Sequence, residues 1–200
     1  MIVDQDSSRF SKKRRTLLAL SIAGLASGLS AFASRAQNAP LRQPDVPYEP
    51  SPQYVVDKML ALAQVNKDDV LYDLGCGDGR IVITAAEKYG ARGVGIDIDP
   101  QRIAEARANA KKAGVENRVQ FVVGDLYASD FSKATVVTLF LWPHVNLKLR
   151  PLLWQQLKIG TRVVSHLWDM GPEWPPEKTE TIRGKKIYYW TITAAQKKAA

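Results

Sequence analysis

A glycine-rich segment from Asp73 to Arg80 carries the strongest chemical signal in the sequence. It reads Asp-Leu-Gly-Cys-Gly-Asp-Gly-Arg and follows a short apolar run that predicts a β-strand. Glycines at a turn from strand to helix let the backbone approach a ligand closely. Their spacing here is Gly-x-Gly-x-Gly, which differs from the Gly-x-Gly-x-x-Gly spacing of dinucleotide-binding proteins. The segment therefore predicts a ligand site for a molecule other than a dinucleotide.

Two carboxylates in this segment, Asp73 and Asp78, indicate the charge of the ligand. A pyrophosphate at the N-terminus of the following helix would be repelled by them, which disfavours a nicotinamide oxidoreductase. S-adenosylmethionine has no phosphate, and its ammonium and sulfonium groups are cations that carboxylates favour. The residues therefore predict S-adenosylmethionine as the cofactor and S-adenosylhomocysteine as the product.

Acids at two further strand ends complete the predicted cofactor site. Asp97 ends the second predicted strand, where a carboxylate accepts hydrogen bonds from ribose hydroxyls. Asp125 follows the third, where it is placed to accept from an adenine amino group, and Ile98 and Leu126 are expected to hold the adenine ring. Parallel strands bring such residues to one crevice at their carboxyl ends.

With these residues, the chain resembles the class I S-adenosylmethionine-dependent methyltransferases over about residues 48–193. Tyr48–Pro52, Asp73–Val82 and Arg162–Ser165 are similar to a branch of small lysine methyltransferases, of the ATP synthase c-subunit lysine methyltransferase type. The resemblance implies that Tyr48–Pro52 is a lid over the cofactor and that a protein lysine is the methyl acceptor. The cofactor-binding residues it implies are Tyr48, Ser51, Asp73, Gly75, Cys76, Gly77, Asp97, Ile98, Asp125 and Leu126.

Methyl transfer is an in-line displacement in which the sulfonium leaves as a neutral group, so no catalytic acid is required. A lysine acceptor must first lose a proton, because its ordinary pKa is about 10.4, and an apolar wall lowers that value. Aromatic candidates for the wall follow the fourth and fifth predicted strands, with Tyr48 and Tyr127 as further candidates; ordinary packing at the sheet edge is the alternative. His144 or His166 could act as the base that removes this proton, because histidine titrates near neutral pH; the alternative is that each has a structural role. The catalytic candidates are Trp142, Pro143, His144 and Trp168.

The segment after the fourth predicted strand also bears on the acceptor class. Many methyltransferases of exocyclic base amines carry Asp/Asn-Pro-Pro-aromatic there, whereas this chain has Leu141-Trp142-Pro143-His144. The basic residues form no stripe interleaved with aromatic residues. We therefore expect a protein substrate or a small-molecule acceptor and no nucleic acid. A module that binds S-adenosylmethionine without turnover is the remaining alternative.

Alternating strands and helices are expected to position these residues. The pattern predicts an α/β fold, a Rossmann-like doubly wound seven-stranded sheet with a C-terminal antiparallel hairpin. The predicted strands are 70–73, 93–98, 118–123, 134–141, 161–165 and the hairpin 178–183 with 186–193, and the predicted helices are 53–65, 79–89, 100–114 and 144–158, with Pro151 as an interruption.

The N-terminal 36 residues read as a signal or anchor segment. A basic cluster precedes the uncharged stretch 17–33, and Arg14-Arg15-Thr16-Leu17-Leu18 resembles a twin-arginine export signal. The sequence predicts either export to the periplasm or membrane association through residues 17–33 with a cytoplasmic domain. A Pro-rich linker and lid, 37–52, a methyltransferase domain, 53–194, and a basic tail, 195–200, follow.

Charge and cysteine content exclude further kinds of site. The formal charge is +8, but residues 1–36 hold six bases and two acids, which leaves +4 for the rest. The single cysteine, Cys76, excludes an intramolecular disulfide framework and a Cys-based zinc site, and with only two histidines we expect no metal.

Overall fold

The structure is a computed structural model that describes residues 42–200. The predicted twin-arginine-like segment, its uncharged stretch 17–33 and the first residues of the linker lie outside the described residues. Among residues 42–200, no helix combines the length and apolar character needed to cross a membrane.

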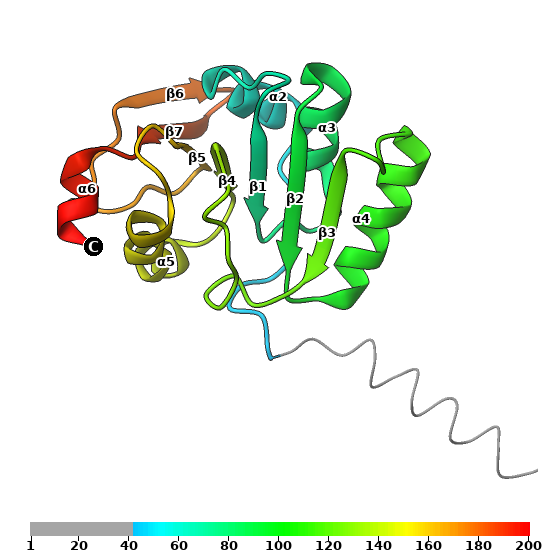
Figure 1. Cartoon of the computed structure of the whole chain (residues 1–200), viewed down its shortest axis with the longest axis horizontal. Helices are drawn as coiled ribbons and strands as arrows, with labels where there is room; N and C mark the ends of the chain where they lie inside the picture. Colours follow the sequence, from blue (N-terminus) through cyan, green and yellow to red (C-terminus); the bar gives the residue numbers. More distant parts are fainter. Residues whose placement is uncertain (1–41) are drawn as a thin grey trace, which may run out of the picture. The chain divides into compact units, whose positions relative to one another are not determined.

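One seven-stranded sheet forms the centre of the fold, with strand order β3-β2-β1-β4-β5-β7-β6. The first five strands pair in parallel, whereas β7 pairs antiparallel with both β5 and β6 (Figure 1). This confirms the predicted doubly wound sheet with a C-terminal antiparallel hairpin. The strands are β1 (Val70–Leu74), β2 (Arg92–Asp97), β3 (Val119–Val123), β4 (Val136–Leu139), β5 (Arg162–His166), β6 (Lys178–Ile182) and β7 (Lys185–Thr191).

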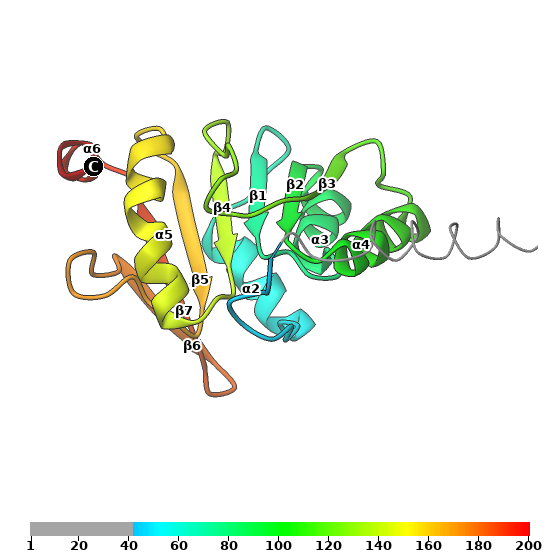
Figure 2. The same cartoon turned by 90° about the horizontal axis from the view of Figure 1, so that it is seen from below.

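Helices cover both faces of the sheet, and each face has its own apolar core. Buried residues of α2, α3 and α4 form one cluster with the sheet, and buried residues of α5 form the other. Figure 2 shows α3 and α4 beside each other and apart from α5. The helices are α2 (Gln53–Leu62), α3 (Arg80–Tyr89), α4 (Pro100–Ala113), α5 (Pro143–Gln156) and α6 (Ala194–Ala199).

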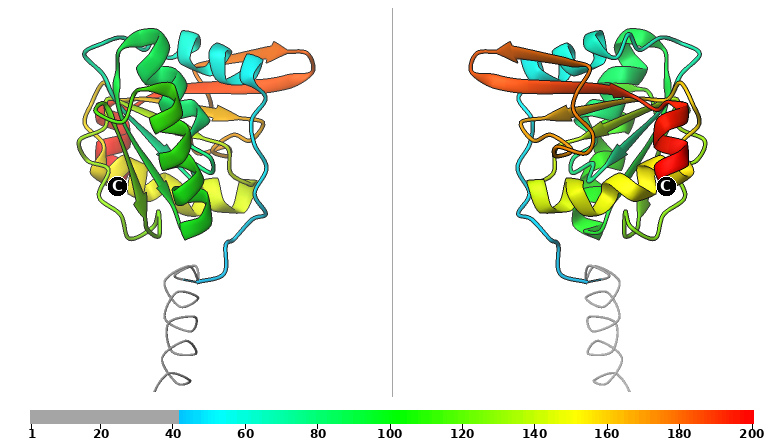
Figure 3. Two further views of the ribbon diagram at one scale, coloured as in Figure 1. Left: turned by 90° about the vertical axis from the view of Figure 1, so that its right-hand side faces the viewer. Right: turned by 90° about the vertical axis from the view of Figure 1, so that its left-hand side faces the viewer.

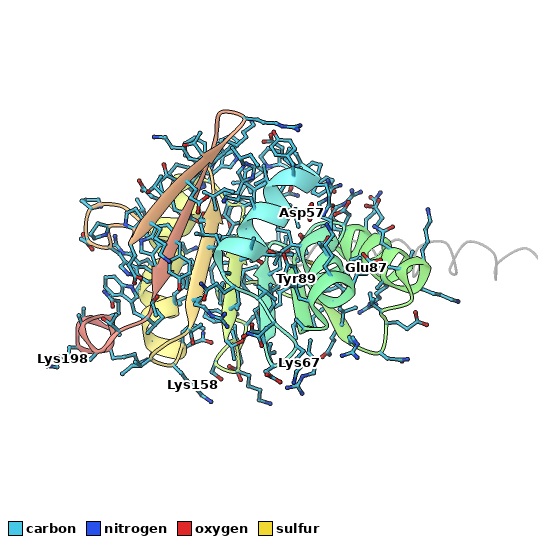
Figure 4. All side chains as sticks on the ribbon, turned by 90° about the horizontal axis from the view of Figure 1, so that it is seen from above. Asp57, Lys67, Glu87, Tyr89, Lys158 and Lys198 are labelled. Carbon is cyan, nitrogen blue, oxygen red and sulfur yellow. The ribbon has the colours of Figure 1, made fainter. Side chains whose placement is uncertain are left out.

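Local residue chemistry sets where these helices begin and end. Asp99 caps α4 by accepting a hydrogen bond from the backbone N–H of Gln101 at 2.8 Å, and Pro100 occupies the first turn. On the neighbouring helices, Lys88 Nζ of α3 forms an ion pair with Asp57 of α2 at 2.7 Å. Figure 4 labels Asp57 on α2 and Tyr89 near the end of α3.

One expectation about helices was wrong. Pro151 was expected to interrupt the helix, but α5 continues through it. Proline has no N–H, so the carbonyl of Leu147, four residues earlier, has no helical hydrogen-bond donor. Both Pro151 and Leu147 are exposed, so water can satisfy this carbonyl. The basic tail, residues 195–200, lies largely in α6 (Ala194–Ala199). Lys197 Nζ donates hydrogen bonds to the carbonyls of Trp154 and Gln155, both at 2.7 Å, at the end of α5, where carbonyls have no helical partner. Figure 3 shows α6 at this end of α5.

Candidate functional site

A pocket lies at the carboxyl ends of β1 to β4, covered by the segment that leads into α2. Figure 1 shows this segment running past the ends of the parallel strands. All ten residues expected to bind the cofactor line the pocket. The lining has two parts. The acidic half lies at the ends of β1, β2 and β3 and contains Asp73, residues 75–77, Asp97, Asp99 and Asp125. The apolar half contains Phe140, Leu141 and Val145 after β4, together with Ser51 of the lid, which bonds to His166, on which Phe140 packs.

The glycine loop after β1 has a conformation that only glycine adopts without strain. Gly77 has a φ of +53°, and a Cβ added to it would overlap the ring of Tyr48. Its backbone N–H donates to Asp97 Oδ2 at 2.8 Å. The backbone N–H groups of Gly75 and Cys76 both donate to the carbonyl of Ile96, which fixes the loop against the end of β2. Tyr48 can therefore lie directly on the loop.

Asp73 is the buried carboxyl of the acidic half. It accepts a hydrogen bond from Thr138 Oγ1 at 2.8 Å. Burial raises the pKa of Asp73 to about 8, with smaller contributions from the carboxylates of Asp97 and Asp78, and against the opposing effect of the hydrogen bond from Thr138. A cation beside Asp73 would favour its ionised form, so this carboxyl suits an ammonium group.

Asp97, the last residue of β2, and Asp99, two residues later, lie in the same half. Asp97 Oδ1 accepts from the backbone N–H of Asp99 at 3.0 Å, and burial raises the pKa of Asp97. These backbone bonds fix the Asp97 carboxylate and leave it lone pairs for other donors. Asp99 was missed from the sequence, although its helix-capping position was a signal for a fixed carboxylate at this strand end.

Asp125 lines the pocket after β3, but its carboxylate already has a partner that the sequence did not indicate. Arg42 Nε donates to Oδ2 at 2.7 Å and Nη2 to Oδ1 at 3.2 Å, while Nη2 also reaches Asp45 at 2.8 Å. The Arg42 guanidinium lowers the pKa of Asp125. This ion pair ties the N-terminal segment to the acidic half.

The predicted lid, residues 48–52, is held by two arginines. The guanidinium of Arg102 lies 4.7 Å from the centroid of the Tyr48 ring, a cation–π contact. Arg80 donates to the backbone carbonyl of Ser51 at 3.0 Å and pairs with Asp78 at 2.6 Å. The glycine segment and the helix after β2 thus both hold the lid in place.

In the apolar half, a buried histidine lies beneath the lid. Nδ1 of His166 and Oγ of Ser51 are hydrogen-bonded at 2.9 Å, and the ring of Phe140 packs on the imidazole at 4.1 Å between centroids. Burial lowers the pKa of His166 to about 4, with a smaller contribution from Lys185. His166 is therefore neutral near pH 7 and too weak a base to hold a proton there.

The four catalytic candidates do not line the pocket. Trp142 and Trp168 are exposed by 45% and 38%, and His144 meets Trp142 edge to face at 6.4 Å. Tyr127 lies under Lys148 Nζ, 3.8 Å from the ring centroid. The aromatic side chain that lines the pocket after β4 is Phe140. It was missed from the sequence, because the expected strand 134–141 included Phe140, whereas β4 ends at Leu139 and leaves Phe140 at the strand end.

Comparisons with known proteins agree on one family. The family model of the ANTKMT methyltransferase domain matches residues 73–178. A protein-lysine N-methyltransferase of Saccharolobus islandicus is 50% identical over 136 residues, covering 68% of this chain and 84% of that protein. The ATP synthase c-subunit lysine N-methyltransferase of Xenopus laevis is 32% identical over 172 residues, covering 86% of this chain and 75% of that protein.

A similar protein of known structure binds the product form of the predicted cofactor. The crystal structure of an RNA methyltransferase from Salinibacter ruber, in complex with S-adenosylhomocysteine, is 58% identical with a TM-score of 0.72 and covers 73% of this chain and 95% of that chain. The acids of the acidic half and the close approach allowed at Gly77 fit such a cofactor. The chain belongs to the ANTKMT-type methyltransferase family and is an S-adenosylmethionine-dependent methyltransferase.

Proposed function

We propose that the chain transfers the methyl group to the side-chain amine of a protein lysine. The observation that carries this proposal is the 50% identity to a protein-lysine N-methyltransferase over 84% of that protein. The pocket supports it, because Phe140, Leu141 and Val145 give its apolar half a wall without charge. An amine against that wall is easier to deprotonate than the ordinary lysine, whose pKa is about 10.4.

The two halves divide the work of the reaction. S-adenosylmethionine, when bound, supplies a methyl group on a positively charged sulfur. Asp73 and its neighbouring carboxylates attract the cationic end of the cofactor, while Asp97 and Asp125 provide acceptors for its sugar and base. The apolar half excludes water and holds a neutral amine, so positioning supplies most of the catalysis, up to about 7–11 kcal/mol for well-oriented groups.

RNA is the acceptor class that competes most directly, because the Salinibacter ruber protein is described as an RNA methyltransferase. Leu141-Trp142-Pro143-His144 departs from the Asp/Asn-Pro-Pro-aromatic pattern of many base-amine methyltransferases. This departure favours lysine. A small-molecule acceptor and binding without turnover are the other outcomes that an assay must separate.

The test is an acceptor assay with the full chain. Extract is incubated with the enzyme and methyl-labelled S-adenosylmethionine, then divided into protein, RNA and small-molecule fractions. We expect label in protein, mapped to lysine, and much less label with the Gly77→Ala variant at a limiting concentration of cofactor. Label confined to RNA or small molecules, or cofactor binding without any transfer, would reject the proposal.

The cellular location remains a prediction from residues 1–36. We propose that this segment directs export or anchors the domain to a membrane. Cell fractionation with N-terminal sequencing of the mature protein distinguishes the two. A mature chain that begins at Met1 in the soluble cytoplasmic fraction would contradict both.

A further inference from the structure

The pair formed by Ser51 and His166 is the buried polar contact that joins the lid to the end of β5. Ser51 is 3% exposed and His166 is fully buried, and 115 residues separate them in the chain. Ser51 lines the pocket, and its hydroxyl bonds to the imidazole on which Phe140, another lining residue, packs. The hydroxyl therefore belongs to the part of the pocket where an acceptor would meet the cofactor.

Ser51 is fixed from two sides. Arg80 holds its backbone carbonyl at 3.0 Å, and His166 Nδ1 holds its Oγ at 2.9 Å. The imidazole is itself packed under Phe140, and within residues 42–200 its Nε2 has no hydrogen-bond partner. Burying a polar nitrogen without a partner costs free energy, and natural proteins keep few such groups. An apolar ring would avoid this cost, so the histidine is better explained by what its other nitrogen does for Ser51.

We propose that Ser51 Oγ accepts a hydrogen bond from the attacking amine, and that His166 is a positioning residue that orients this hydroxyl. The inference rests on the proposed function, since it requires an amine acceptor. Whichever ring nitrogen carries the proton, the bond to Nδ1 leaves Oγ a lone pair for a donor in the pocket.

The step is balanced without proton transfer to either residue. The lone pair of the neutral amine forms the new N–C bond, and the S–C bond breaks with both electrons moving to sulfur. The positive charge passes from sulfur to nitrogen, and the methylated amine loses its extra proton to solvent afterwards. Ser51 accepts an N–H throughout, which leaves the nitrogen lone pair free to attack. A neutral imidazole behind the hydroxyl adds no charge that would oppose the cation forming on nitrogen.

Matched variants of both residues test the pair in the full chain. His166→Phe keeps a ring against Phe140 but removes Nδ1, whereas His166→Asn keeps a polar atom near the position of Nδ1. Ser51→Val and Ser51→Thr have the same shape, but only threonine keeps the hydroxyl. Melting temperature, S-adenosylmethionine affinity by calorimetry, and kcat for lysine methylation are measured for each variant.

We expect Ser51→Val and His166→Phe to lower kcat about 10- to 100-fold, the size of one lost hydrogen bond to a group that becomes charged. S-adenosylmethionine affinity should change less than about 3-fold, because the contact serves the acceptor. His166→Asn and Ser51→Thr should stay within about 5-fold of the wild type. The double variant Ser51→Val/His166→Phe should be no slower than Ser51→Val alone, since one residue acts through the other.

Three results would overturn the inference: independent, multiplying effects in the double variant, a loss of cofactor affinity that matches the loss of kcat, or a His166→Asn variant as slow as His166→Phe. If His166→Phe does not fold, two other comparisons test the inference. One is Ser51→Val against Ser51→Thr, and the other is the double variant Ser51→Val/His166→Asn against Ser51→Val alone. A wild-type enzyme that methylates no lysine would remove the proposed function as well. A wild type that does so, with unaffected variants, would remove only this inference.

Discussion

The acidic and apolar halves of the pocket differ in how they are built. In the acidic half, the carboxylates of Asp73, Asp97 and Asp125 lie at or just after the ends of β1, β2 and β3, and neighbouring backbone N–H groups hold Asp97 in place. In the apolar half, Ser51 and His166 meet from segments 115 residues apart. The first half is specified by local sequence and the second by the tertiary fold. We therefore expect substitutions in the acidic half to affect cofactor binding and those in the apolar half to affect the acceptor.

The largest effect on the acidic half is expected from Gly77→Ala. The new Cβ would be strained at a φ of +53° and would overlap the ring of Tyr48, so we expect S-adenosylmethionine affinity to fall at least about 30-fold, the equivalent of about 2 kcal/mol. Calorimetry on the purified variant measures this loss.

Gly114→Ala is the matched control. Gly114 has a φ of +70°, but a Cβ there would meet nothing within 4 Å. Both variants should lose about 1–2 kcal/mol of stability from backbone strain, and only Gly77→Ala should lose cofactor affinity. Equal affinities in the two variants would show that the close approach of loop and lid does not matter for binding.

Asp73 gives the acidic half a pH dependence. Its pKa of about 8 means that the free carboxyl carries a proton at neutral pH, whereas a bound cation requires the ionised form. Affinity of the wild type should therefore rise with pH between 6 and 7.5, by up to about tenfold per pH unit. Asp73→Asn should remove this dependence and weaken binding about tenfold at pH 7.5.

Asp125→Asn serves as the control for that titration. The pKa of Asp125 is lowered by Arg42, so this carboxyl is ionised across the same range and its loss should not alter the pH slope. A flat profile for the wild type would contradict the assignment of Asp73 to the cationic end of the cofactor.

Smaller effects are expected outside the apolar half, at the exposed tryptophans. Trp142→Ala and Trp168→Ala should raise KM for the protein acceptor about 3- to 10-fold through lost apolar contact, with cofactor affinity unchanged. Ile159→Ala, at a side chain that is 64% exposed and does not line the pocket, is the control. An unchanged KM in both tryptophan variants would assign these side chains to ordinary surface packing.

The smallest effect is expected from Arg42→Ala. Its side chain is 34% exposed, and ion pairs of this kind contribute about 0.2–1 kcal/mol, so cofactor affinity should fall about 1.5- to 5-fold and less at high salt. Lys67→Ala removes the 80% exposed pair with Asp68 and should leave affinity unchanged; Figure 4 labels Lys67. A rise in affinity would mean that Arg42 competes with the cofactor for Asp125.

These differences also explain how far the sequence could be interpreted. The strand-helix alternation predicted the sheet and its hairpin, and the glycine and acid spacing predicted residues that all line one pocket. Such signals lie within a few residues of the strand ends. Phe140 was hidden in an apolar run, because nothing in that run marks where β4 stops at Leu139.

Contacts between residues far apart in the sequence could not be predicted from local sequence patterns. The Arg42 pair with Asp125 and the burial of His166 under Phe140 depend on how the N-terminal segment crosses the finished sheet. The position of His166 after an apolar strand suggested a base near neutrality, but only its burial reveals that the imidazole is neutral and bonded to Ser51.

The central claim, methylation of a protein lysine by this pocket, is tested most directly by locating a trideuterated methyl group on the acceptor by tandem mass spectrometry. The full chain is incubated with S-adenosylmethionine that carries the heavy methyl group and with cell extract. We predict the heavy methyl group on the side-chain nitrogen of a lysine, and a strongly reduced amount with Gly77→Ala at a limiting concentration of cofactor. The same group found on an RNA base, with no modified lysine, would contradict the account.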